Sequence, residues 1–190
     1  DHRDLHSFPT RRSSDLVGFA LFVAFFPQLL AGPIERWPGL SEQLVAAHRP
    51  TPDMVLEGLQ LLAYGLFLKL VLGDWFGVYV DNAYTDPSAN SSPAALLGLY
   101  GFTIQLYGDF CGYSLIALGS ARLFGIRLTV NFRQPLLSRT IAEFWQRWHI
   151  SLSSWLRDYL YIPLGGNRHG ERKMYRNLIL TMLLGGLWHG

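Results

Sequence analysis

The sequence predicts an all-α protein that crosses a membrane several times. Hydrophobic residues make up 49% of its 190 residues and aromatic residues 14%, whereas charged residues make up only 16%, which is more apolar than a typical soluble domain. The apolar residues cluster into four runs, at residues 16–31, 54–80, 94–118 and 178–188. Two of these runs exceed the roughly 20 residues that a helix needs to cross a hydrocarbon core. A bilayer is therefore the expected solvent.

Charge and cysteine content exclude other classes of protein. The net charge of +2 is small and no basic stretch alternates with aromatic residues, so we expect no nucleic-acid partner. The single cysteine, Cys111, cannot form an internal disulfide framework. It has no neighbouring Cys or closely spaced His pair to complete a metal site, so we expect a packed helix residue, no metal and no bound cofactor.

The two ends of the chain differ from the apolar part. Residues 1–15 are polar, lack periodicity and contain no small-residue cleavage site of the kind that ends a signal peptide. They resemble translated sequencing-adapter sequence, so we expect them to be non-native and exclude them, His2 and His6 included. The last run stops at Gly190 and is too short to cross a bilayer. We therefore expect residues 16–190 to be a partial membrane domain, truncated at both ends.

The loops between the runs predict their orientation. Residues 81–93 contain two acidic and no basic residues, whereas residues 121–140 contain four arginines and no acid. The positive-inside rule places the second loop in the cytoplasm. The run at 94–118 is then expected to cross from outside to inside and the run at 54–80 in the opposite direction. Glu57, Lys69, Gly73 and Asp74 leave room for a break or a tilt within the latter.

Residues 141–161 predict one amphipathic helix. At 100° per residue, one side of it is apolar and the other carries charged residues and serines. The apolar side consists of Phe144, Trp145, Trp148, Leu152, Trp155, Leu156, Tyr159 and Leu160. This aromatic side favours an interfacial or re-entrant helix at the cytoplasmic face. His149 lies within the apolar side, where an imidazole is biased toward its neutral form, and it is either a hydrogen-bonded packing residue or part of a site.

Two ionisable residues within apolar runs are candidates for function, because such groups are costly in a bilayer unless they are paired or hydrated. Asp109 has Gln105 and Tyr113 one turn away as candidate partners, and both a structural role that locks neighbouring helices and a catalytic role are open. His189 stands in GGLWHG. If its helix begins near Leu178, it lies about 17 Å along the axis and near the bilayer midplane.

A neutral histidine at this depth is suited to acid–base chemistry. Its unperturbed pKa of about 6.5 lets it take a proton from a hydroxyl that attacks a carbonyl. No GxSxG elbow is present, and Ser114, Ser151 and Ser153 lack a local nucleophile signature. Direct transfer from a bound donor to an acceptor hydroxyl is therefore the simpler mechanism, with the two substrates entering from opposite faces.

Four stretches carry a family resemblance that covers residues 17–190. They are FFPQLLAGPIERWPGL, YGDFCGYSLIALGSARLFGI, NFRQPLLSRTIAEFWQRWHISLSSWLRDYLYIPLGGNR and RNLILTMLLGGLWHG. Together they resemble the membrane-bound O-acyltransferase family, and their order and spacing are similar to those of its bacterial alginate O-acetyltransferase branch. The resemblance implies that His189, in the WHG motif, is catalytic and that His149, in RWHISLS, lines the reaction tunnel from the cytoplasmic side.

The resemblance also implies substrates and partners. An acetyl group from cytoplasmic acetyl-CoA would pass through this multi-pass protein of the bacterial inner membrane. It would reach periplasmic acetyltransferase partners that O-acetylate an exopolysaccharide acceptor such as alginate, and membrane lipid would surround the protein. Asp109 and Asn131 lie in matching motifs and are expected to be scaffold residues. The family's spans after WHG are absent, so the fragment alone need not be active.

Two other interpretations remain open from the residues. In a second branch of the same family the reaction is D-alanyl transfer from a carrier-protein thioester to teichoic acid. A different class is a non-catalytic membrane scaffold or transport subunit, in which Asp109 and His189 would relay protons. The genes beside this one distinguish the two branches, since a carrier protein and its ligase indicate D-alanylation and periplasmic acetyltransferases indicate acetylation.

Overall fold

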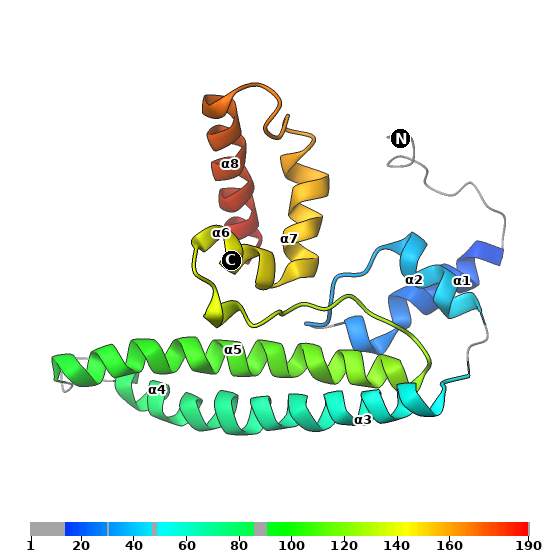
Figure 1. Cartoon of the computed structure of the whole chain (residues 1–190), viewed down its shortest axis with the longest axis horizontal. Helices are drawn as coiled ribbons and strands as arrows, with labels where there is room; N and C mark the ends of the chain where they lie inside the picture. The colour runs from blue at the N-terminus through cyan, green and yellow to red at the C-terminus, as the bar shows by residue number, and fades with distance from the viewer. Residues whose placement is uncertain (1–13, 30, 47–48, 86–90, 190) are drawn as a thin grey trace.

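The computed structural model describes residues 14–29, 31–46, 49–85 and 91–189, and within these ranges the chain is helical without strands. This confirms the predicted all-α class for the described part. Two long helical segments lie side by side, a pair of short helices packs at one end of them, and a helical hairpin stands on top (Figure 1). Most of the proposed non-native segment, residues 1–13, lies outside the described residues.

The longest helical segment runs from Pro52 to Thr85. It consists of α3 (Pro52–Phe67), a π-helical stretch (Leu68–Asp74) and α4 (Trp75–Thr85). Within the described residues it is the one helical segment that is long and apolar enough to cross a membrane. The π-helical stretch contains Lys69, Gly73 and Asp74, three of the four residues at which the sequence left room for a break or tilt, whereas Glu57 lies within regular α3. Each backbone hydrogen bond there spans one more residue than in an α-helix, which widens the helix.

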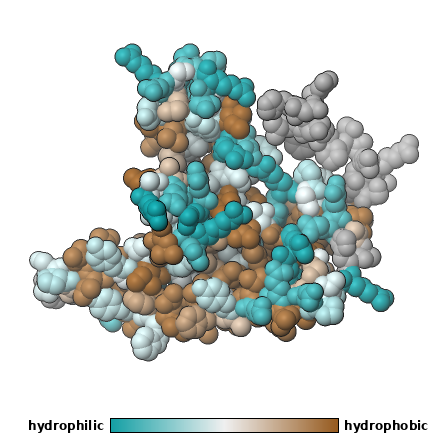
Figure 2. All heavy atoms as spheres, in the orientation of Figure 1, coloured by the Kyte–Doolittle hydropathy of each residue, from teal (hydrophilic) through white to brown (hydrophobic). Residues whose placement is uncertain are grey.

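The partner of this segment is α5 (Ser92–Leu123), and glycines bring the two backbones together. A Cβ atom on Gly65 would lie 2.7 Å from the Gly112 carbonyl oxygen, and one on Gly112 would lie 2.8 Å from the Gly65 oxygen. Gly58 and Gly119 repeat this arrangement further along. These helices therefore pack backbone against backbone, as small residues allow in membrane proteins. Figure 2 shows their largely hydrophobic outer surface.

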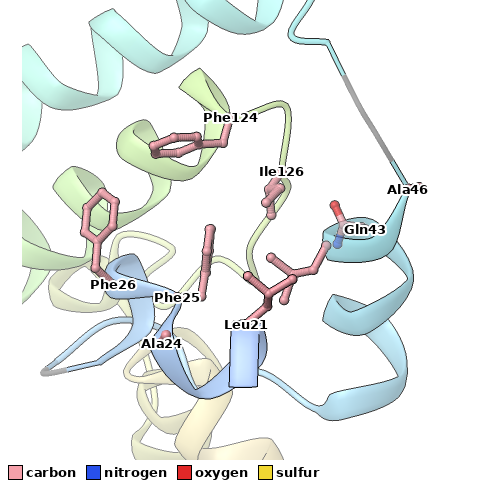
Figure 3. A pocket seen from close by; sticks show the side chains of 9 residues that line it. Leu21, Ala24, Phe25, Phe26, Gln43, Ala46, Phe124 and Ile126 are labelled. Atoms are coloured by element: carbon pink, nitrogen blue, oxygen red, sulfur yellow. The ribbon is translucent and has the colours of Figure 1, made fainter. Parts of the chain in front are cut away.

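The N-terminal helices close one end of this pair. They are α1 (Ser14–Ala24), a 3₁₀ turn (Phe26–Gln28) and α2 (Trp37–Val45). A small core forms there from Leu40, Leu118, Ala121, Ile126 and Leu128. Beside it lies an apolar cleft of about 390 Å³ between α1, α2 and the segment after α5 (Figure 3). Gln43 borders the cleft but bonds the backbone N–H and carbonyl of Arg127, so its amide is already paired.

The C-terminal half carries a 3₁₀ turn (Pro135–Leu137), α6 (Ile141–Arg147), α7 (Ile150–Leu156), a second π-helical stretch (Arg157–Tyr161) and α8 (Glu171–His189). The prediction of one continuous helix over residues 141–161 is wrong. Trp148 is extended, with φ −101° and ψ 128°, and His149 is left-handed, with φ 43° and ψ 56°. The chain therefore turns between α6 and α7, and α7 and α8 form the upright hairpin of Figure 1.

Candidate active site

The break between α6 and α7 is caused by a residue that lies far away in sequence. The first N–H groups of any helix lack partners within it. In α7 they are bonded by Asn131, because its carbonyl oxygen accepts from the Ile150 N–H at 3.0 Å and its Oδ1 from the Ser151 N–H at 3.3 Å. On the other side of the break, the Arg133 N–H donates to the Arg147 carbonyl at 3.0 Å. Periodicity along one helix contains no signal for such a cap.

Asn131 is the centre of a buried polar network. Asn131 is only 1% exposed to solvent. Its Nδ2 donates to Ser114 Oγ on α5 at 3.1 Å. The Ser151 hydroxyl donates to Asn131 Oδ1 at 2.6 Å and accepts from the Ile34 N–H at 2.9 Å. The network joins four segments of the chain. Because both the nitrogen and the oxygen of the Asn131 amide are hydrogen-bonded, the amide fixes the relative positions of these segments.

His149 lies at the N-terminus of α7 against an aromatic cluster. Its ring meets that of Phe110 edge to face, with centroids 4.6 Å apart. Phe110 and Trp148 both pack on Phe132, at 5.0 and 5.1 Å. Burial among these rings and, to a smaller extent, repulsion by His189 together lower the pKa of His149 from 6.5 to about 4. The imidazole, which lies outside the candidate span, is therefore neutral at pH 7.

His189 ends α8, and its ring has a defined tautomer. Nδ1 lies 2.8 Å from the Gly185 carbonyl oxygen, one turn earlier. A carbonyl oxygen only accepts, so Nδ1 carries the proton and, in the neutral ring, Nε2 carries the lone pair. The ring also meets Trp188 edge to face at 5.0 Å. A Cβ on Gly186 would meet no atom within 4 Å, which leaves open space beside this turn.

The position of His189 along its helix differs from the expected one. The helix begins at Glu171, seven residues before Leu178, so the histidine lies about 27 Å along the axis and not about 17 Å. The charged residues before Leu178 are helical but not apolar, so the apolar run alone does not show where the helix begins. The helix approaches α7 closely at Gly185, where a Cβ would lie 3.2 Å from Leu156 Cδ1.

The two predicted histidines lie at the ends of α7 and α8, whereas Asp109 lies on α5, directly before the Phe110 that packs on His149. Each histidine comes from a different helix end, α7 at its start and α8 at its finish. Among the described residues, no group of three His, Cys, Asp or Glu side chains could hold a metal ion. The chemistry available to this pair is proton transfer.

Asp109 is paired with a different residue from those predicted. Its carboxylate bonds Lys69 Nζ at 2.6 Å, and the same ammonium bonds Asp74 at 2.5 Å. The prediction of Gln105 and Tyr113 as partners is therefore corrected. The reason is that the antiparallel neighbour presents a charged partner across the interface, where a carboxylate gains more than from a neutral group on its own helix.

Sequence reasoning also missed two structural contacts. Arg36 bonds Asp158, and Arg157 holds the other carboxylate oxygen at 2.8 Å. The pair between Arg36 and Asp158 ties the segment before α2 to the second π-helical stretch. Asn177, which is fully buried, donates from Nδ2 to the Gly166 carbonyl at 3.0 Å. A polar residue directly before an apolar run is the signal that could have revealed Asn177.

The chain belongs to the membrane-bound O-acyltransferase family, whose model matches residues 6–190. It is 46% identical over 187 residues to a probable alginate O-acetylase AlgI of Pseudomonas fluorescens, an alignment that covers 98% of this chain and 37% of the relative. It is 41% identical to a peptidoglycan O-acetyltransferase of Helicobacter pylori, covering 93% of this chain and 34% of the relative. A teichoic acid D-alanyltransferase of Bacillus subtilis is 31% identical, covering 89% and 45%. The chain therefore spans about a third of the length of the first two of these relatives.

Proposed function

We propose that the full-length protein is a multi-pass O-acyltransferase of the bacterial inner membrane. It transfers acetyl from acetyl-CoA toward O-acetylation of an exopolysaccharide such as alginate, together with periplasmic acetyltransferase partners. The family match supports the reaction class. Support for acetyl comes from relatives at 46% and 41% identity whose names specify O-acetylation, against 31% for one that specifies D-alanyl transfer.

The observation that carries this proposal is the hydrogen bond from His189 Nδ1 to the Gly185 carbonyl. In the neutral ring this bond leaves the lone pair on Nε2, the nitrogen on the other side of the ring from the Gly185 carbonyl. Nε2 takes the proton of an acceptor hydroxyl while that oxygen attacks the acetyl carbonyl. The tetrahedral intermediate then expels the coenzyme A thiolate, which takes the same proton from the imidazolium. His149 stays neutral and lines the donor's path.

The test compares two histidine variants in the full-length protein. His189→Ala should lower acetyl transfer by roughly 10²- to 10⁴-fold, the usual contribution of a general base. The matched control is His169→Ala, an exposed histidine in the turn before α8, which should leave the rate unchanged. The assay measures the rate at which labelled acetyl is transferred from acetyl-CoA to the polymer, divided by the amount of folded protein. Polymer acetylation that survives His189→Ala while transport changes would instead favour the transport subunit.

The D-alanyl alternative has one observation in its favour, the Bacillus subtilis relative that aligns with 89% of this chain. Incubating the full-length protein with either acetyl-CoA or a D-alanyl carrier thioester separates the two reactions. If the acceptor polymer is labelled only when the carrier thioester is the donor, the reaction is D-alanyl transfer and the acetyl proposal is wrong. The role of His189 would be the same in both, since a thioester is the donor each time.

A further inference from the structure

We propose that Asn131 is a positioning residue for His149, an inference that rests on the proposed function. Asn131 acts on the histidine through the backbone. Its bonds go to the N–H groups of Ile150 and Ser151, the two residues that directly follow the histidine. Any shift of Asn131 therefore moves the start of α7, and His149 with it.

The backbone conformation of His149 explains why the start of α7 needs hydrogen bonds from Asn131. With φ at 43°, the residue occupies a left-handed conformation that is uncommon for a residue with a Cβ atom. A continuous helix from α6 into α7 would relieve this conformation and turn the ring to another face. The bonds from Asn131 compete with that continuation, because they occupy the N–H groups that the helix would otherwise bond to carbonyls of α6.

A second path leads from Asn131 to the ring through its neighbour. Phe132 packs on Phe110 with centroids 5.0 Å apart, and Phe110 packs on His149 at 4.6 Å. Asn131 is anchored to α5 through Ser114, the helix that also carries Phe110. The Asn131 amide thus fixes the backbone position of His149 and also the position of Phe110, on which the imidazole ring packs.

The test is a double-mutant cycle in the full-length protein, with acetyl transfer as the readout. Asn131→Ala should lower kcat by about 10²-fold, the cost of a misplacement of about 1 Å in the wall that positions the donor. In the His149→Ala background the same change should cause no further loss, because the positioned group is gone. A purely structural role predicts the same fold-loss in both backgrounds, and that result overturns the inference.

The controls separate misfolding and failure of the proposed function. Gln43→Ala removes an amide that bonds the same connecting segment at Arg127, and it should leave kcat unchanged. Should Asn131→Ala not fold, Ser114→Ala removes only the acceptor of the Asn131 amide, with a smaller loss expected that also vanishes in the His149→Ala background. If His149→Ala alone leaves transfer intact, the proposed role of His149 is wrong, whereas an equal loss in both backgrounds rejects only the role of Asn131.

Discussion

The α3–α5 pair and the α6–α8 region are held together in opposite ways. In the first, glycines such as Gly65 and Gly112 remove side chains so that backbones touch. In the second, buried amides of Asn131 and Asn177 add directed hydrogen bonds between segments. Close packing fixes distances without specifying unusual dihedral angles. Directed bonds can hold a left-handed residue, and the candidate site lies in the region that has them.

The largest effect is expected where the two backbones touch. Gly112→Leu places a side chain where even a Cβ lies 2.8 Å from the Gly65 oxygen and 2.9 Å from the Lys69 nitrogen. We expect a loss of about 3 kcal/mol or more in the free energy of unfolding, the upper end of overpacking. Thermal unfolding in detergent measures it. Gly39→Ala, whose Cβ would meet nothing within 4 Å, is the control, and equal losses for both would contradict backbone packing.

A smaller loss is expected from removing an amide in the hairpin. Asn177→Ala leaves the Gly166 carbonyl buried without its donor, which should cost about 1–3 kcal/mol. The exposed Asn167 in the same turn provides the control, since Asn167→Ala should change stability little. Chemical unfolding of the two variants, followed by tryptophan fluorescence, makes the comparison. Equal stability would mean that the hairpin depends on packing alone.

The smallest effect is a pH dependence from His149. Its pKa is about 4 in the folded protein and 6.5 when unperturbed, so between these values the unfolded state binds a proton that the folded state does not. Stability must therefore fall as pH falls below about 6.5. From pH 7.5 to pH 6, the melting temperature of the wild type should decrease more than that of His149→Gln. Parallel decreases would show that the ring is more hydrated than its aromatic contacts indicate.

Much of the fold followed from apolar runs, because each run long enough to cross a bilayer is also long enough to form a helix. Residues 54–80 lie within Pro52–Thr85, and residues 94–118 lie within α5. The site was only partly predictable. His149 and His189 could be singled out by their apolar surroundings, but the cap from Asn131 and the pairing of Asp109 with Lys69 join residues distant in sequence. Helical periodicity describes neighbours one turn apart and carries no information about such contacts.

The hydrogen bond within the last turn of α8 has a consequence for the order in which the site is made. Ser114, Asn131 and Ser151 all precede Glu171 in the chain, so the frame around His149 can form during synthesis before α8 exists. His189 needs only Gly185, four residues earlier, to set its tautomer. His189, the proton acceptor in the proposed mechanism, is therefore synthesised after the residues that fix the position of His149.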